Sequence, residues 1–419
     1  MALHSRRSVL ASAAATVATA GCLGDPEDGR LGETTPDDAP ADTTAAATDA
    51  ASPSPGDTPI GGGEPATVES VDGAWTHPGF DPAGTRFDPG GRVPDTKPRV
   101  AWSASYGGER AAVVVADESV FVAGETGLLA LDATSGERRW SRSYGPETAV
   151  SGPVVGDALY VAVDDEVRAL SPADGSPRWT STAPAAPVRR LVADGGTVAV
   201  TTEGTVESRG AVLAIVDGEE RWQFRAEDAT VSRFGGLAVG DDAVYAVGEN
   251  SGSATWHHAL EPATGEERWR ANGLNHSTAL TVAGDAVLAG GFYGNTVAQA
   301  TRSGAERWRV QVGPAIDTVG ADGDVAFVGG YDAEGPNLHA VSLADGERRW
   351  TDAGGGTILG AGEGLVVAGG GRLRGLDAAT GEPHWERRPA WDPTGIALAD
   401  GVLFVAGDDG TVRALIGVS

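Results

Sequence analysis

Short runs of apolar residues alternate with polar turns along most of the chain. The first complete run predicts four strands, at residues 111–116, 120–123, 128–132 and 138–143. Acidic or glycine-rich turns between the first and second strand recur at Asp117, Asp157, Asp194, Asp241, Asp285, Asp322, Gly362 and Asp400. This pattern predicts an all-β protein made of repeated four-stranded units.

An eleven-residue segment recurs seven times without gaps, from ALDATSGERRW at 130–140 to GLDAATGEPHW at 375–385. Its seventh position is always glycine: Gly136, Gly175, Gly218, Gly265, Gly304, Gly346 and Gly381. Its eleventh position is always tryptophan: Trp140, Trp179, Trp222, Trp269, Trp308, Trp350 and Trp385. Successive tryptophans are 35 to 47 residues apart. Periods of about 40 residues with several strands per unit are typical of a β-propeller.

The repeat also predicts how the ring closes. Eight turns recur against seven repeat tryptophans, and Trp102, in the run P-R-V-A-W, is the missing eighth. The last strands, within residues 395–416, end where a fourth strand is needed. We therefore expect the segment of Trp102 to supply that strand. The result is an eight-bladed β-propeller over residues 71–419, closed by pairing of its N- and C-terminal strands.

The first 22 residues resemble an export signal. Arg6 and Arg7 precede a short apolar run, which ends in T-A-G-C at Cys22. This arrangement is similar to a twin-arginine signal with a lipobox, in which Cys22 becomes the lipidated first residue of the mature protein. The apolar run of about 13 residues is too short to span a bilayer, which needs about 20. The sequence predicts an exported protein that is lipid-anchored to the outer face of the cytoplasmic membrane.

Composition changes sharply after Cys22. Residues 23–70 are rich in Thr, Ala and Pro, and ten acidic residues face one basic residue between Asp25 and Glu64. Such a segment buries too little apolar surface to fold, so we expect a disordered linker, either bare or glycosylated on its threonines.

The whole chain is acidic. It has 59 acidic residues, 31 basic residues and a formal net charge of −28, and Lys97 is the sole lysine. This balance argues against binding of nucleic acid through charge and favours a salt-adapted protein, because concentrated salt screens the repulsion between like charges. Cys22 is the single cysteine, which excludes internal disulfides and thiolate zinc sites.

The repeat A-x-D-x-x-T-G-x-x-x-W resembles the tryptophan-docking motif of the pyrroloquinoline quinone (PQQ) propellers. Asp377, Thr380, Gly381 and Trp385 fit this motif, and the resemblance covers roughly residues 75–419. It implies that each tryptophan stacks against the glycine region of the next repeat. Trp75 with F-D-P-A-G-T-R-F at 80–87 is similar to the lead-in segment of the family.

Two branches of the family imply different functions. One resembles the lipid-anchored propeller of the bacterial outer-membrane assembly machinery, which binds partner proteins. The other comprises quinoprotein dehydrogenases, which hold PQQ and calcium over the channel. Many of these enzymes also have a pair of adjacent cysteines there. The chain has no cysteine in the propeller region and lacks the length of the enzymes. We therefore favour a monomeric, non-catalytic scaffold for envelope proteins without cofactor; a PQQ dehydrogenase and a sugar-binding protein are the alternatives.

One face of the predicted ring carries the surplus residues. The loops between second and third strands are enlarged at 202–210, 249–256 and 331–337. Non-repeat aromatic residues fall on this face: Phe234, Trp256, Phe292, Tyr293, Tyr331 and Trp391. They form either a binding patch or a hydrophobic cover over the channel. Two acidic turns there, Asp164-Asp165 and Asp408-Asp409, are either calcium ligands or solvated turns.

Overall fold

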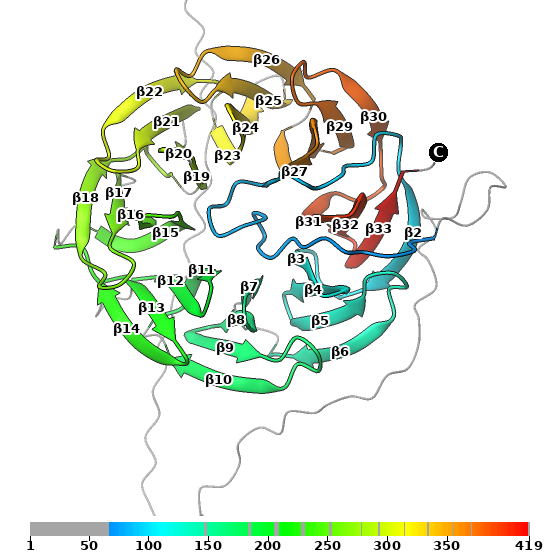
Figure 1. Cartoon of the computed structure of the whole chain (residues 1–419), viewed down its shortest axis with the longest axis horizontal. Helices are drawn as coiled ribbons and strands as arrows, with labels where there is room; N and C mark the ends of the chain where they lie inside the picture. Colours follow the sequence, from blue (N-terminus) through cyan, green and yellow to red (C-terminus); the bar gives the residue numbers. More distant parts are fainter. Residues whose placement is uncertain are drawn as a thin grey trace, which may run out of the picture. The chain divides into compact units, whose positions relative to one another are not determined.

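A computed structural model describes the propeller region of the chain. The described residues are 67–145, 148, 150–182, 186–204, 209–227, 231–250, 254–277, 279–291, 294–313, 315–332, 335–354, 356–369 and 371–417, and all belong to one compact unit. They form eight antiparallel blades arranged in a ring (Figure 1). The expected all-β, eight-bladed β-propeller is therefore confirmed.

The first four blades follow one another along the chain, and each runs from the channel outward. Blade 1 comprises β3 (Ala111–Ala116), β4 (Ser119–Gly124), β5 (Gly127–Asp132) and β6 (Arg138–Ser143). Blade 2 comprises β7 (Val150–Val155), β8 (Leu159–Val163), β9 (Glu166–Leu170) and β10 (Pro177–Thr182). Blade 3 comprises β11 (Val188–Asp194), β12 (Thr197–Thr202), β13 (Val212–Val216) and β14 (Glu219–Phe224). Blade 4 comprises β15 (Val231–Val239), β16 (Val244–Asn250), β17 (Thr255–Leu260) and β18 (Glu267–Asn272).

The next three blades repeat this order. Blade 5 comprises β19 (Ala279–Ala283), β20 (Ala286–Gly290), β21 (Asn295–Ala300) and β22 (Glu306–Gln311). Blade 6 comprises β23 (Ala315–Asp322), β24 (Val325–Asp332), β25 (Gly335–Ser342) and β26 (Arg348–Ala353). Blade 7 comprises β27 (Thr357–Gly362), β28 (Leu365–Gly369), β29 (Leu373–Asp377) and β30 (Pro383–Arg387). The strands expected for the first unit agree with β3 to β6 within one residue at each end.

Blade 8 closes the ring. Its first three strands are β31 (Pro393–Ala399), β32 (Val402–Gly407) and β33 (Thr411–Ile416), and its outermost strand is β2 (Arg99–Ser105). β2 pairs antiparallel with β33, and Trp102 lies opposite Ala414. The predicted closure is therefore confirmed. One feature was not expected: the two-residue strand β1 (Phe87–Asp88) adds a fifth, parallel strand to the inner edge of blade 7.

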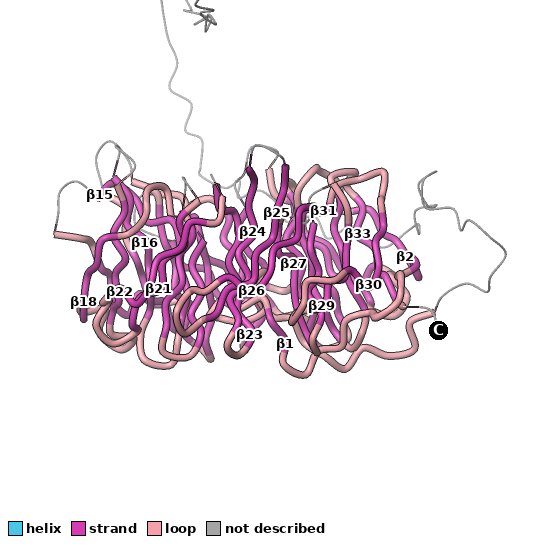
Figure 2. The backbone as a smooth tube through the Cα atoms, turned by 90° about the horizontal axis from the view of Figure 1, so that it is seen from above, coloured by secondary structure: helices cyan, strands magenta, loops and turns pink. Residues whose placement is uncertain are grey.

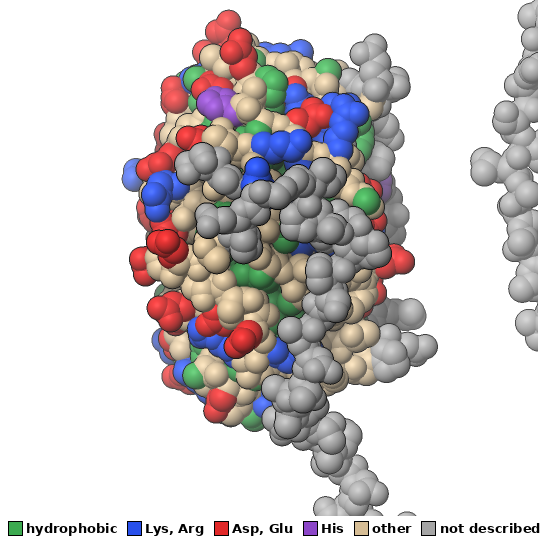
Figure 3. Space-filling view, turned by 90° about the vertical axis from the view of Figure 1, so that its right-hand side faces the viewer, with side chains coloured by type: hydrophobic (Ala, Val, Ile, Leu, Met, Phe, Trp, Pro, Cys, Tyr) green, Lys and Arg blue, Asp and Glu red, His purple; other side chains and the backbone are tan. Residues whose placement is uncertain are grey.

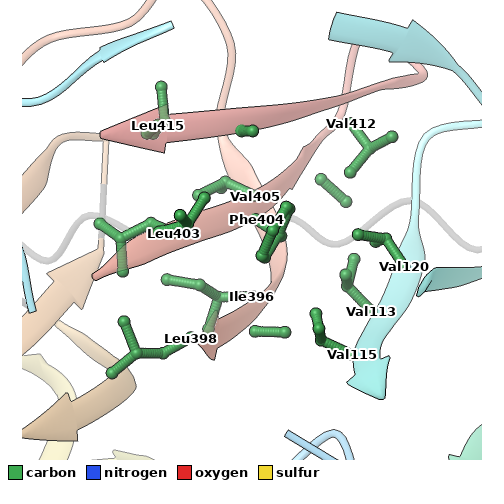
Figure 4. Packing of buried hydrophobic residues seen from close by; sticks show 14 of the residues in the cluster. Val113, Val115, Val120, Ile396, Leu398, Leu403, Phe404, Val405, Val412 and Leu415 are labelled. Atoms are coloured by element: carbon green, nitrogen blue, oxygen red, sulfur yellow. The ribbon is translucent and has the colours of Figure 1, made fainter. Parts of the chain in front are cut away.

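The hydrophobic core lies between neighbouring blades. At the closure, Val113, Val115 and Val120 of blade 1 pack against blade 8 (Figure 4). Similar clusters join the other pairs of neighbours, because the apolar positions of each sheet point alternately to its two faces. Each fully buried Val or Leu side chain contributes about 1.5–3 kcal/mol. The ring therefore holds together through many similar interfaces.

The outer surface carries the charge. Acidic and basic side chains are interspersed on the side of the ring that faces the viewer in Figure 3. On the outermost strands arginines pair with acidic residues of their own blade, as Arg307 does with Asp285 at 2.6 Å. Within the described ranges no helix is long and apolar enough to cross a membrane.

Candidate functional site

The repeat tryptophans lie between consecutive blades. The indole of Trp222 in blade 3 packs on Gly265 of blade 4, where an added Cβ atom would lie 2.5 Å from the ring. Its Nε1 donates a hydrogen bond to Pro262 O at 2.8 Å. Gly265 has a φ of +73°, which favours glycine over any residue with a Cβ. The same contact joins Trp102 to Gly136, Trp140 to Gly175, Trp269 to Gly304, Trp308 to Gly346 and Trp350 to Gly381.

Two tryptophans dock differently. Trp385 donates from Nε1 to Pro94 O, at 2.6 Å, on the chain segment that leads into β2. Trp179 meets blade 3, whose β13–β14 turn is the tight pair Asp217-Gly218, with both residues at positive φ. In this shorter turn Gly218 still faces Trp179, but the indole is only half-buried. The repeat is thus regular in sequence at this position and irregular in backbone geometry.

The residues before β2 line the channel. This channel segment, residues 75–92, lies inside the ring in Figure 1 and contacts the innermost strand of successive blades. Its carbonyl groups accept hydrogen bonds of 2.8–2.9 Å from inner-strand N–H groups of six blades. In blade 3, His77 Nε2 contacts the backbone of Ala193, at 3.0 Å from its O and 3.2 Å from its N. The accepting residues are Trp75, Thr76, Pro82, Ala83, Thr85 and Arg86, and the donors are Val115, Val155, Val239, Val282, Ala321 and Ala361.

These contacts explain why the segment adopts this path. The innermost strand is an edge strand, and its free N–H groups need acceptors where water is excluded. Asp81 fixes a sharp bend of the channel segment, after its contact with blade 3. Its carboxylate accepts the N–H of Thr85 at 2.9 Å and the hydroxyl of Thr85 at 2.8 Å. Gly84 occupies the bend at a φ of +70°. Arg92 then pairs with Asp400 and completes the circuit at blade 8.

A cavity of about 170 Å³ lies between the channel segment and the inner strands. Arg86 of the segment and Arg190 of β11 both line it, together with His77 and Asp81. Burial, with a smaller contribution from Arg190, lowers the pKa of Arg86 to about 10. Arg190 is exposed at the cavity, whereas Arg86 is half-buried. The lining of the cavity therefore carries two arginines and one carboxylate, that of Asp81.

A second, wider cavity adjoins the first. It has a volume of about 530 Å³ and shares Pro78, Arg190 and Leu191 with the inner cavity. Arg189 and Glu203 form an ion pair at its wall. A β-bulge between Val188 and Arg190 interrupts the pairing of β11 with β12. Because a bulge re-aims side chains, it lets the two consecutive arginines take different environments.

The aromatic residues expected on the enlarged-loop face lie in different places. Tyr331 is 43% exposed and belongs to the β24–β25 hairpin, whose eight-residue strands reach the face opposite β1 (Figure 2). Part of the loop expected at 331–337 is thus strand. Trp256 is half-buried, and Phe234 is fully buried in the core between blades 3 and 4. Phe292 and Tyr293 lie outside the described residues.

Trp391 belongs to a buried polar cluster in blade 8. The guanidinium of Arg413 lies 4.4 Å from the centre of its ring, and Arg413 is fully buried. Asp409 accepts two hydrogen bonds from Arg413, at 3.0 and 2.5 Å, while Asp408 accepts the N–H of Asp392. The Asp408-Asp409 turn is therefore engaged with protein groups. Within the described residues, no group of three or more His, Cys, Asp or Glu side chains is arranged to hold a metal ion.

The N-terminal predictions cannot be placed in the structure. Arg6, Arg7 and Cys22 lie outside the described residues, as does most of the linker. The signal, the lipid anchor and the linker therefore remain predictions from the sequence.

Sequence reasoning missed the arginine-lined cavity. A signal for it existed: Arg190 and Arg86 are charged residues within an inner strand and within the lead-in run F-D-P-A-G-T-R-F. A charged side chain on a strand that faces a narrow channel has no route to bulk solvent except along the axis. The sequence could not show that Arg86 and Arg190 line the same cavity.

The ring, its docked tryptophans and its repeat define a β-propeller of the PQQ-like class. A family model described as outer membrane protein assembly factor BamB matches residues 124–352 and 338–417, so the chain belongs to this family. BamB from Moraxella catarrhalis has a similar structure, with 16% identity, a TM-score of 0.59, and coverage of 76% of this chain and 100% of that one.

Other solved structures share the fold. The quinohemoprotein alcohol dehydrogenase ADHIIG from Pseudomonas putida has 14% identity and a TM-score of 0.66, over 83% of this chain and 81% of that one. The computationally designed protein Ika8 has 14% identity and a TM-score of 0.63, over 75% of this chain and 98% of that one. No curated protein sequence matches the chain. These similarities identify the fold, which natural and designed proteins with different activities share.

Proposed function

We propose that the chain is a non-catalytic, lipid-anchored propeller that binds other proteins at the outer face of the cytoplasmic membrane. The observation that carries this proposal is the projecting β24–β25 hairpin with the exposed Tyr331. Tyrosine is enriched at protein interfaces, because its ring buries a large apolar area while its hydroxyl stays hydrogen-bonded. Membership of a family described as an outer membrane protein assembly factor supports the same proposal.

A photo-crosslinking amino acid at position 331, introduced in intact cells, tests the proposal. We expect discrete crosslinked species at Tyr331 and none at Arg221, an exposed control position on the outer strand β14. Tyr331→Ser should leave the free energy of unfolding within about 0.5 kcal/mol of wild type, as for most surface substitutions. Equal crosslinking at the two positions would contradict the proposed binding face.

The anchor has its own test. Cys22→Ser should release the exported protein into the medium, because the lipidated cysteine is its attachment in this proposal. Arg6→Lys combined with Arg7→Lys should retain the protein inside the cell. Cell fractionation measures both outcomes, and a Cys22→Ser protein that stays on the membrane would refute lipid anchoring.

The residues around the channel do not fit calcium-bound PQQ. Calcium takes six to eight oxygen ligands, whereas Asp81 is the one carboxylate among the described residues that line the inner cavity, and Thr85 already occupies both of its oxygens. We therefore propose that the chain works without this cofactor. Titration of the full chain with PQQ and calcium should leave tryptophan fluorescence unquenched after correction for absorbance. Saturable quenching at micromolar PQQ would instead favour the dehydrogenase.

A further inference from the structure

Two arginines from distant parts of the sequence line the inner cavity. Arg86 is held by blade 7, because its carbonyl accepts the N–H of Ala361 at 2.8 Å. Arg190 belongs to β11 of blade 3, which lies across the ring from β27 (Figure 1). Both side chains nevertheless line the inner cavity and repel each other. The inner cavity therefore brings together side chains whose backbones are held by opposite blades.

These charges lack compensation from the protein. Among the described residues, no carboxylate forms an ion pair with Arg86 or Arg190, and Arg86 Nη1 donates a long hydrogen bond of 3.5 Å to Ile358 O. The nearby Asp81 is engaged by Thr85, and Glu203 by Arg189. Both ring nitrogens of His77 are engaged, Nδ1 by the hydroxyl of Thr76 and Nε2 by the backbone of Ala193. Arg190 is exposed and Arg86 half-buried, so both guanidinium groups keep N–H donors available to an anion that enters the cavity.

The backbone around Arg86 supports a defined position for its side chain. Arg86 has a φ of +57°, a conformation that residues with a Cβ rarely adopt. Two features keep it there: the hydrogen bond from Ala361 and the short parallel pairing of β1 with β27 that begins at the next residue. Strain of this kind persists where the surroundings over-determine the conformation, often at ligand-binding positions. The guanidinium therefore projects from a fixed anchor.

We propose that the inner cavity binds a small anion with two or more negatively charged oxygens, held between Arg86 and Arg190. The planar guanidinium groups offer forked N–H donors that match phosphate, sulfate and carboxylate oxygens. The cavity of about 170 Å³ holds such an anion with a few waters, because a water occupies about 30 Å³. The wider cavity, which shares Arg190, gives the anion a path from solvent. Inorganic phosphate or sulfate and a small dicarboxylate share this chemistry.

Anion binding should be measured on the full chain by isothermal titration and thermal unfolding. The probes are sodium phosphate, sodium sulfate and disodium succinate, each compared with sodium chloride at equal ionic strength. At least one probe should bind with a stoichiometry of one per chain and raise the unfolding temperature above the chloride control, as expected for a ligand that binds the native state. Preference for phosphate or for succinate identifies the source of the anion.

Two substitutions assign this effect to the cavity. Arg190→Gln and Arg86→Gln should each weaken binding by about 10- to 100-fold, the loss expected for a charged hydrogen bond. The control Arg221→Gln, on the outer surface of blade 3, should bind like wild type. In chloride alone Arg190→Gln should be as stable as wild type or more so, because the repulsion between the two arginines is gone.

Sulfate stabilises most proteins through exclusion from their surface, so the comparison between variants is decisive. If sulfate or phosphate raised the unfolding temperature of wild type and of Arg190→Gln by the same amount, the proposal would be overturned. The absence of any rise over chloride with all three probes would also overturn it. A rise in unfolding temperature seen in wild type and Arg221→Gln, but not in Arg86→Gln or Arg190→Gln, would establish the site.

Discussion

Replacement of Gly265 by alanine tests how the blades are held together. Gly265 has a φ of +73°, and a Cβ atom there would lie 2.5 Å from the Trp222 indole. The ring has little freedom to retreat, because its Nε1 donates to Pro262 O at 2.8 Å. The left-handed conformation costs an alanine about 1–2 kcal/mol. Overpacking against the indole adds about 1–3 kcal/mol. We therefore expect Gly265→Ala to lower the free energy of unfolding by about 2–5 kcal/mol.

Gly284 provides a matched control in the neighbouring blade. It also has a positive φ, of +55°, but a Cβ atom added there would meet nothing within 4 Å. Gly284→Ala should therefore show the conformational cost of about 1–2 kcal/mol alone. Urea titration of both variants, followed by circular dichroism at constant potassium chloride, measures the difference. If Gly265→Ala and Gly284→Ala agree within about 0.5 kcal/mol, contact between glycine and tryptophan does not stabilise the blade interface, and the reasoning fails.

Further predictions concern single side chains and salt. Trp140 is buried, whereas Trp179 is only half-buried, so Trp140→Ala should cost about 3–5 kcal/mol in urea titrations and Trp179→Ala at least about 1 kcal/mol less. The buried Arg413 binds Asp409 with both ends of its fork, so Arg413→Lys should destabilise by about 1–3 kcal/mol, whereas Arg307→Lys on the outer surface should change stability by under about 0.5 kcal/mol. Burial lowers the pKa of His77 from 6.5 to about 4, so the unfolded state takes up a proton first as the pH falls. Stability is then lost between about pH 6.5 and 4, by about 2 kcal/mol between pH 7 and pH 5, and His77→Gln should remove that share from the pH dependence of the urea midpoint. The net charge of −28 predicts a thermal midpoint that rises with potassium chloride; a midpoint independent of the salt would contradict salt adaptation.

The blades were predictable because their determinants are local and repeated. Alternation of apolar residues specifies each strand, and the fixed distance from glycine to tryptophan marks each outer turn. Closure by Trp102 followed from counting, since eight inner turns require an eighth outer strand. Blade 3 departs from the geometry that its sequence predicts. Its glycine keeps the repeat position, yet Asp217-Gly218 forms a tighter hairpin than the other repeats, and the indole of Trp179 is only half-buried.

The candidate site was harder to predict because it depends on contacts distant in sequence. Arg86 and Arg190 are over a hundred positions apart, and neither belongs to a repeated motif. Their meeting depends on the path of the channel segment, which is set by backbone hydrogen bonds to almost every blade. Backbone bonds of this kind leave no pattern of side chains. The burial of the aromatic residues was also not predictable from the sequence. Phe234 and Tyr331 were both expected on the enlarged-loop face, yet Phe234 is buried and Tyr331 is exposed.

The channel segment links the proposed anion site to the closure of the ring. It runs directly into β2, the strand that pairs with β33 and supplies the last docking tryptophan, Trp102. Loss of the pairing between β2 and β33 would free the chain that follows the channel segment. The contacts along the channel would then have to hold the segment alone. An anion between Arg86 and Arg190 adds a bridge from the segment to blade 3, across the axis from blade 7. To the extent that closure keeps the segment in place, closure favours anion binding, and by reciprocity anion binding favours closure by the same free energy.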